Sequence, residues 1–199
     1  MTFFDTLEYA DRSATLAING LSNPFTDMLM PVLSNRLVST AVIVAMLGFC
    51  LWRLGWRKTL LLLGIILLGI LASDQLANLV KYSAQRLRPC WDSWMTDRGL
   101  VILERRGSKY GFFSAHAATS AAMAAAIVLQ LRRSSARGSI TVALVSGLWV
   151  LGVSLSRVFV GKHFLGDTIV GMAVGVCVAW VTVALVNWAA NKFFTKFVV

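Results

Sequence analysis

Residues 156–167 read SRVFVGKHFLGD and lie where two long apolar segments, 140–160 and 164–188, meet. Each segment is long enough for a transmembrane helix, which needs about 20 mostly apolar residues. The stretch also holds four ionisable residues: Arg157, Lys162, His163 and Asp167. Ionisable side chains are costly at membrane depth and usually serve a function there. The stretch therefore predicts a membrane fold with a functional site between two spans.

The spacing of His163 and Asp167 predicts an activated imidazole. The two residues stand four positions apart, so a helix that begins near His163 would carry both side chains on one face. A carboxylate there holds the imidazole in one tautomer and raises its basicity. Such an imidazole is a candidate nucleophile or general base. Arg157, just upstream, has the fork geometry that suits a pair of phosphate or carboxylate oxygens.

The composition assigns the whole chain to the membrane. Of 199 residues, 57% are hydrophobic and only 14% are charged, with a mean hydropathy of +0.72, well outside the range of soluble domains. The first eleven residues include three acidic and no basic side chains, so they do not resemble a cleavable signal peptide. The net charge of +10 is spread between apolar segments, which argues against nucleic-acid binding.

Five apolar segments predict five membrane spans. Their approximate ranges are 37–54, 59–81, 112–131, 140–160 and 164–188. Residues 1–36 contain no apolar run of span length, which favours interfacial amphipathic helices there over a sixth span. The expected fold is an all-α polytopic transmembrane helix bundle. We expect one integral membrane domain over residues 1–199, with the N-terminal helices in 1–36 and the catalytic bundle in 37–188.

Basic residues between the segments predict the orientation. They follow the first, third and fifth segments without any acidic residue: Arg53, Arg57, Lys58, Arg132, Arg133, Arg137, Lys192 and Lys196. By the positive-inside rule that side is cytoplasmic. The polar loop 89–111 and the stretch 156–167 would then face outward, to the periplasm of a cell with an inner membrane.

Small residues in two of the segments predict close helix packing. Alanines crowd the third segment, and Gly171 and Gly175 form a G-x-x-x-G pattern in the fifth. Such patterns let the backbones of neighbouring membrane helices approach closely.

A line of polar residues ends the second segment: Asp74, Asn78, Lys81, Gln85 and Arg88. On one continuous helix these residues would share a face, and such a face looks into a bundle rather than at lipid. In the alternative interpretation Lys81 and Arg88 reach the headgroups, with Asp74 neutralising Lys81.

The residues Ser114-Ala115-His116 open the third segment on the same side. A helix N-terminus offers free backbone N–H groups to an anion, and the Ser114 hydroxyl adds another donor. A lone histidine near a helix end is more often structural. Both histidines of this chain are predicted on one side of the membrane beside basic residues, however, which favours a functional role for His116.

The predicted cluster suits phosphoryl transfer. Cations and backbone donors stabilise a dianionic phosphoryl group, and in-line displacement needs one nucleophile and one acid, which two histidines can supply. Magnesium would require more carboxylates, and two histidines with Asp167 are few ligands for zinc. The sequence therefore predicts neither a metal nor a cofactor.

At these residues the sequence resembles the type 2 phosphatidic acid phosphatase superfamily, the lipid phosphate phosphatases that share a site with vanadium haloperoxidases. Its motif K-x6-R-P matches Lys81 through Arg88-Pro89, and its motif S-R-x5-H-x3-D matches Ser156-Arg157 through Asp167. The middle motif, P-S-G-H, reads Phe113-Ser114-Ala115-His116, so that Phe and Ala replace Pro and Gly.

The resemblance implies a role for each site residue. His163 would be the nucleophile that forms a phosphohistidine, Asp167 its orienting partner, and His116 the acid that protonates the leaving group. The phosphate would be bound by Lys81, Arg88, Ser114, Ala115 and Arg157. No metal is implied.

We therefore expect a lipid phosphatase that acts at the outer membrane face. The resemblance suggests undecaprenyl diphosphate, phosphatidylglycerophosphate or phosphatidic acid as substrates, with a lipid A phosphatase as the nearest alternative. From another class, the chain would be a noncatalytic membrane protein that binds anionic lipids. A haloperoxidase is disfavoured because those relatives are soluble. The expected partners are membrane lipids, with no obligate protein partner and no nucleic acid.

Overall fold

The computed structural model describes residues 2–134 and 138–193, and within these ranges the regular structure is helical. The elements in chain order are α1 (Phe3–Asn19), α2 (Pro24–Ser34), α3 (Arg36–Ala84), the short 3-10 helix η1 (Pro89–Trp91), α4 (Ser93–Thr96), α5 (Ala115–Arg133), α6 (Ser139–Phe159) and α7 (Leu165–Phe193). The prediction of an all-α bundle is confirmed.

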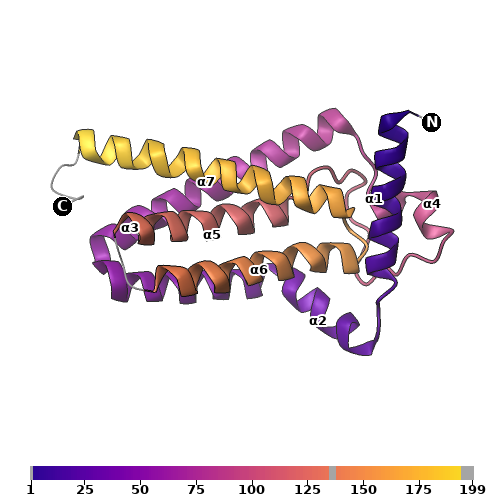
Figure 1. The fold of residues 1–199 in the computed structure, drawn as a ribbon, viewed down its shortest axis with the longest axis horizontal. Helices are drawn as coiled ribbons and strands as arrows, with labels where there is room; N and C mark the ends of the chain where they lie inside the picture. The colour runs from indigo at the N-terminus through magenta and orange to yellow at the C-terminus, as the bar shows by residue number, and fades with distance from the viewer. Residues whose placement is uncertain (1, 135–137, 194–199) are drawn as a thin grey trace.

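Helix α3 consists of two legs that meet at Gly55. The backbone there has φ 76° and ψ 168°, a conformation that favours glycine. The first leg runs along the bundle to this turn, and the second returns at a slant, so that the two legs diverge from the turn (Figure 1). Ile43 of the first leg and Ile70 of the second accordingly line the same groove. The two legs correspond to the first two predicted spans.

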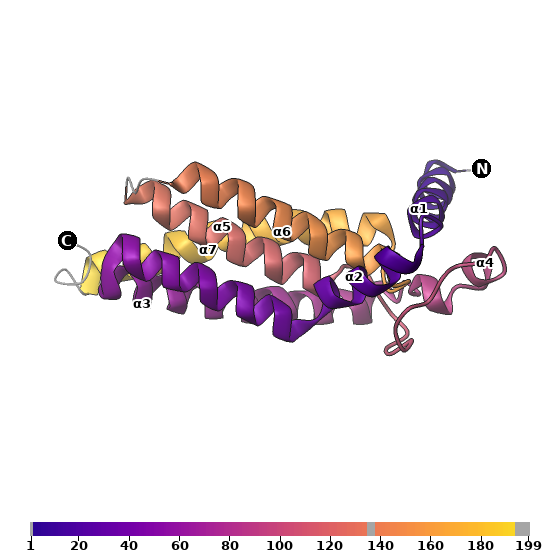
Figure 2. The ribbon, with the colours of Figure 1, turned by 90° about the horizontal axis from the view of Figure 1, so that it is seen from below.

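By length and composition, three helices of the described chain can cross a membrane: α3, α6 and α7. Helix α5, the third predicted span, is shorter, with 19 residues, and carries many small and polar side chains. It packs against α3, α6 and α7 (Figure 2). The two legs of α3 together with α5, α6 and α7 thus match the five predicted segments, although only three helices meet the apolarity of a span.

The G-x-x-x-G pattern predicted close helix packing, and in the structure it brings α7 against α5. A side-chain carbon at Gly171 would lie 2.6 Å from the Ser114 carbonyl oxygen, and one at Gly175 would collide with the Ala118 carbonyl. Only glycine permits this approach. As a result, the first turn of α5 lies beside the first turn of α7, where Asp167 is located.

Helix α1 lies across one end of the bundle, roughly at right angles to the long helices (Figure 1). The helix is also fixed to the bundle, because the Asn19 amide donates to the Phe159 carbonyl (2.9 Å) and accepts from the Val101 N–H (2.8 Å). Helix α2 packs against α6. The N-terminal helices are therefore part of the folded core at this end.

Candidate active site

The stretch 156–167 forms a tight turn between α6 and α7. The backbone N–H groups of Lys162 and His163 both donate to the Arg157 carbonyl, at 3.0 and 3.1 Å. Gly161 has φ +74°, and a side-chain carbon there would lie 2.9 Å from the Val101 carbonyl oxygen. The turn therefore needs a glycine, and it folds His163 back toward the end of α6.

The predicted pairing of His163 with Asp167 is present. The two side chains are buried, and His163 Nδ1 lies 3.3 Å from Asp167 Oδ2, which also accepts from the Phe164 N–H (3.1 Å). Because Nδ1 faces the carboxylate, Nε2 points away from it. Burial lowers the pKa of His163 to about 4, against the influence of Asp167, which raises it. The imidazole is therefore neutral near pH 7, as a nucleophile must be.

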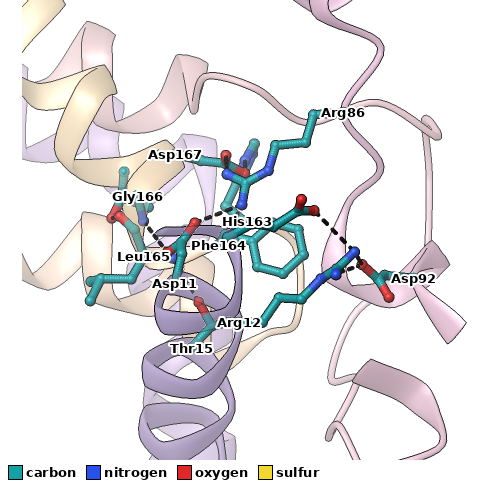
Figure 3. A network of polar contacts seen from close by, with 12 residues as sticks. Asp11, Arg12, Thr15, Arg86, Asp92, His163, Phe164, Leu165, Gly166 and Asp167 are labelled. Carbon is teal, nitrogen blue, oxygen red and sulfur yellow. Dashed lines mark hydrogen bonds and ion pairs between the residues drawn. The ribbon is translucent and has the colours of Figure 1, made fainter. Parts of the chain in front are cut away.

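Asp167 has a second partner that sequence reasoning missed. Its Oδ1 accepts from Arg86 Nη1 at 2.6 Å, and Arg86 Nη2 donates to Asp11 Oδ2 at 2.7 Å (Figure 3). The two carboxylates raise the pKa of Arg86, outweighing the opposite effect of its burial. Arg86 lies within the K-x6-R-P motif at one of its unspecified positions. Its place between Lys81 and Arg88 is the only sequence feature that could have drawn attention to it.

Arg157 is buried beneath α2 and the polar loop. Its guanidinium contacts the Ser34 hydroxyl and lies 3.5 Å from Glu104 Oε2, while Ser34 donates to Glu104 Oε1 at 2.8 Å. Its Nε is buried without a hydrogen-bond partner. A buried donor of this kind is costly unless a ligand satisfies it, so this geometry suits the predicted role in phosphate binding. Sequence reasoning missed both Ser34 and Glu104.

Ser114 is the N-cap of α5, as the prediction of an anion site requires. Its hydroxyl accepts from the Ala117 N–H at 3.4 Å, and its own N–H donates to the Asp167 carbonyl at 3.0 Å. Ala115 and His116 form the first turn, whose N–H groups have no partner within the helix. The positive end of α5 is therefore directed at the turn that carries His163.

The predicted continuous polar face from Asp74 to Arg88 is wrong beyond Ala84. Helix α3 ends there because Gln85 adopts a left-handed conformation with φ 46°. Lys81 is in the last helical turn, whereas Arg88 reaches the site from the following loop, where its Nε donates to the Tyr110 carbonyl at 3.0 Å.

Gly111 brings that loop against the histidine. A side-chain carbon at this position would lie 2.8 Å from Arg88 Cγ, 3.4 Å from Asp167 Oδ2 and 3.5 Å from His163 Nδ1. Any larger residue would separate Arg88 from the imidazole. Sequence reasoning found no pattern in this loop and missed Gly111.

The structure brings all the predicted site residues to one end of the bundle. Arg157, Lys81 and His163 all act electrostatically on His116, and Arg88 and Arg157 act on His163. His116 also lines a groove of about 420 Å³ between the two legs of α3 and α5. Among the residues that the structure describes, no group of three histidine, cysteine or acidic side chains could hold a metal ion. The arrangement provides cations for an anion, a buried neutral imidazole and a second imidazole.

Known proteins are similar to this chain in sequence or in fold. Two curated relatives, both named lipid A 4'-phosphatase, are 27% identical to this chain. The relative from Bacteroides thetaiotaomicron aligns over 172 residues, 85% of this chain and 74% of that protein. The relative from Porphyromonas gingivalis aligns over 186 residues, 92% of this chain and 75% of that protein.

Two solved structures have a similar fold. The PAP2-type phosphatidylglycerolphosphate phosphatase from Bacillus subtilis has a TM-score of 0.69 at 20% identity, covering 94% of this chain and 88% of that one. The LpxE protein of Aquifex aeolicus has a TM-score of 0.62 at 16% identity, covering 86% and 93%. The family model of the PAP2 superfamily matches residues 57–191, which include every motif residue named above. The chain therefore belongs to the PAP2 superfamily and is a membrane phosphatase of that family.

Proposed function

We propose that the protein is a lipid phosphatase that works without a metal, at the outer face of the membrane, through a phosphohistidine on His163. The observation that carries this proposal is the buried pair of His163 and Asp167 beside Arg88 and Arg157. A neutral imidazole backed by a carboxylate is a nucleophile, and arginines bind phosphoryl oxygens. A protein that only held anionic headgroups would need the cations but not the imidazole and its carboxylate.

In the first step, Lys81, Arg88, Arg157, the Ser114 hydroxyl and the N–H groups of Ala115 and His116 bind the phosphoryl oxygens. His163 Nε2 attacks phosphorus, and the bond from phosphorus to the lipid oxygen breaks. His116 donates its proton to that oxygen, so the lipid leaves as a neutral alcohol. The Nδ1–H of His163 remains hydrogen-bonded to Asp167, and the carboxylate stabilises the positive charge that develops on the ring.

In the second step, water hydrolyses the phosphohistidine. His116, now neutral, accepts a proton from water as the oxygen attacks phosphorus, and the bond from phosphorus to His163 Nε2 breaks. Inorganic phosphate leaves, and both histidines return to their starting protonation states. The exchange of acid and base roles between the two steps needs a histidine on the leaving-group side, which is the role assigned to His116.

The groove beside His116 suits the lipid part of the substrate. The leaving oxygen must lie next to His116, and the groove continues from there between apolar side chains of α3, including Ile43, Leu67 and Ile70. A lipid can thus keep its tail among apolar residues while its phosphate lies among the cations. Access would be lateral, from the bilayer.

Lipid A is the substrate that the relatives favour, because both curated relatives are named lipid A 4'-phosphatase. A phosphatidylglycerophosphate is the second candidate, favoured by the Bacillus subtilis structure. Undecaprenyl diphosphate and phosphatidic acid remain as comparison substrates. In every case the reaction is hydrolysis of a lipid-linked phosphate.

The orientation is also part of the proposal. The turn at Gly55, the end of α5 and the end of α7 lie at the end of the bundle opposite α1 and α4 (Figure 1). Arg53, Arg132 and Lys192 belong to that end, which supports a cytoplasmic assignment for it. We infer a multi-pass inner membrane protein, one phosphatase domain, whose site faces the periplasm.

The test is phosphate release by the purified protein in detergent with EDTA. The panel comprises lipid A phosphorylated only at the 4' position, lipid A phosphorylated only at the 1 position, phosphatidylglycerophosphate, undecaprenyl diphosphate and phosphatidic acid. We expect release from 4'-phosphorylated lipid A to be fastest and His163→Ala to abolish it. Persistence of activity in His163→Ala, or its loss with EDTA, would contradict the mechanism. Binding of the whole panel without hydrolysis would favour the noncatalytic alternative.

A further inference from the structure

A chain of charged groups connects α1 to His163 (Figure 3). His163 contacts Asp167, whose other oxygen accepts from Arg86 at 2.6 Å. Arg86 in turn donates to Asp11 of α1 at 2.7 Å. Neither Arg86 nor Asp11 is a motif residue. The proposed mechanism therefore gives no role to the contacts that join α1 to Asp167.

Helix α1 also caps the first turn of α7. Asp11 Oδ1 accepts from the Gly166 N–H at 2.7 Å, and the Thr15 hydroxyl accepts from the Leu165 N–H at 2.9 Å. These N–H groups have no partner within α7 and are satisfied by side chains of another helix. A side-chain carbon at Gly166 would lie 2.8 Å from Asp11 Oδ2, so glycine allows the close contact. The first turn of α7, which carries Asp167, is thus fixed from α1.

Arg86 is held tightly enough to act as a support. Its two terminal nitrogens bind two different carboxylates, and its guanidinium carbon lies 4.2 Å from the centre of the Phe164 ring. The side chain is only 23% exposed, and that of Asp167 is fully buried. Burying a carboxylate is costly unless it is paired, and Arg86 pairs with Asp167.

We propose that Arg86 is a positioning residue for the reaction: it holds Asp167 so that Oδ2 faces His163 Nδ1, and Asp11 holds Arg86. The inference rests on the proposed role of His163 as nucleophile. Because Arg86 binds Oδ1, the carboxylate cannot rotate away from the imidazole. The tautomer of His163 with a free Nε2 is thereby maintained in both steps. Helix α1 thus helps to position the nucleophile through Asp11.

The expected effect falls on turnover rather than on substrate binding. Arg86 binds two carboxylates and is not one of the cations proposed to bind phosphate. Its loss should therefore leave the phosphate-binding residues in place. Misplacement of a catalytic group by about 1 Å can cost roughly 10²-fold in rate. We therefore expect Arg86→Gln to lower kcat by about 10- to 100-fold, with KM within about threefold of the wild type. Arg86→Lys should recover part of the loss, since it restores the charge but binds only one carboxylate well.

The neighbouring Arg12 provides a matched control. It lies next to Asp11 on α1 and forms an ion pair of similar length with Asp92 (2.8 Å), away from Asp167 (Figure 3). Arg12→Gln therefore removes a comparable salt bridge of α1, and its kcat should stay within about threefold of the wild type. The thermal unfolding midpoint in detergent is measured for each variant, so that loss of fold is separated from loss of positioning.

The experiment combines Arg86→Gln, Asp167→Asn and their double variant, with His163→Ala and Arg12→Gln alongside. Phosphate release is measured from 4'-phosphorylated lipid A and dioctanoyl phosphatidic acid. If Arg86 acts through Asp167, the double variant is no slower than Asp167→Asn alone, because the two losses are not additive. Fully multiplicative losses, or a wild-type kcat in Arg86→Gln while His163→Ala is inactive, would overturn this inference alone. Activity in His163→Ala would overturn the proposed mechanism itself.

Discussion

Asp167→Asn tests the geometry around the nucleophile, because the carboxylate is surrounded by donors. Oδ1 accepts from Arg86, and Oδ2 accepts from the Phe164 N–H and from His163 Nδ1. Both positions therefore require an acceptor, and an asparagine supplies only one. The charged arginine, at 2.6 Å, should retain the amide oxygen, which turns the amide nitrogen toward the imidazole.

The consequence is the wrong tautomer of His163. An amide N–H can donate only to an unprotonated Nδ1, so the imidazole proton moves to Nε2 and the nucleophilic lone pair is lost. Restoring the productive tautomer costs a charge-assisted hydrogen bond, about 1.5–3 kcal/mol, and leaves a conflict between buried donors, about 1–3 kcal/mol. Together these amount to about 2.5–6 kcal/mol, or roughly 10²- to 10⁴-fold in kcat.

The assay is steady-state phosphate release at saturating substrate, with His163→Ala measured alongside. We expect the KM of Asp167→Asn to stay within about threefold of the wild type, since the cations proposed to bind phosphate are unchanged. Its kcat should remain above that of His163→Ala, which lacks the nucleophile. A kcat within threefold of the wild type would refute the reasoning from donors. Activity at or below that of His163→Ala would refute the ranking of nucleophile over orienting partner.

Three further predictions concern the surroundings of the histidine. Gly111→Ala should raise KM by about tenfold without unfolding the protein, because its side-chain carbon displaces Arg88; unchanged kinetics would contradict the close approach. Glu104→Gln should lower KM by about two- to fivefold, since it removes a charge that competes with phosphate for Arg157 at about 0.5–1 kcal/mol, and a higher KM would reverse that assignment. Formation of the phosphoenzyme in a single turnover should persist at pH 5.5 and fall as the pH approaches 4, because burial lowers the pKa of His163 to about 4 and only the neutral ring attacks; a midpoint near 6.5 would exclude that environment.

The motif residues and the bundle could be predicted from the sequence because their patterns are local. Apolar runs give the segments, and G-x-x-x-G predicts close packing of the fifth segment without identifying its partner, which is α5. The spacing of four between His163 and Asp167 gives their pairing once α7 begins at Leu165. The end of α3 was harder to predict. The helical spacing continues to Arg88, but the left-handed Gln85 and the nearby Pro89 end the helix earlier.

The supporting contacts could not be predicted because they join residues far apart in the chain. Asp11 meets Arg86 from 75 positions away, and Ser34 meets Glu104 from 70. A single acidic residue on an amphipathic helix looks like any residue at a membrane interface. Its role becomes visible only when α1 is seen to lie across the start of α7 (Figure 1).

The central claim is that His163 carries the phosphoryl group during turnover. The most direct measurement is mass spectrometry of peptides from an alkaline quench of the His116→Ala variant with a substrate whose leaving group needs no acid, such as a p-nitrophenyl phosphate. In this variant, hydrolysis of the intermediate lacks its base, so the phosphoenzyme should accumulate. We expect one phosphate on His163 and none in His163→Ala. Phosphate on another residue, or turnover by the wild type without any adduct on His163 in either protein, would contradict it.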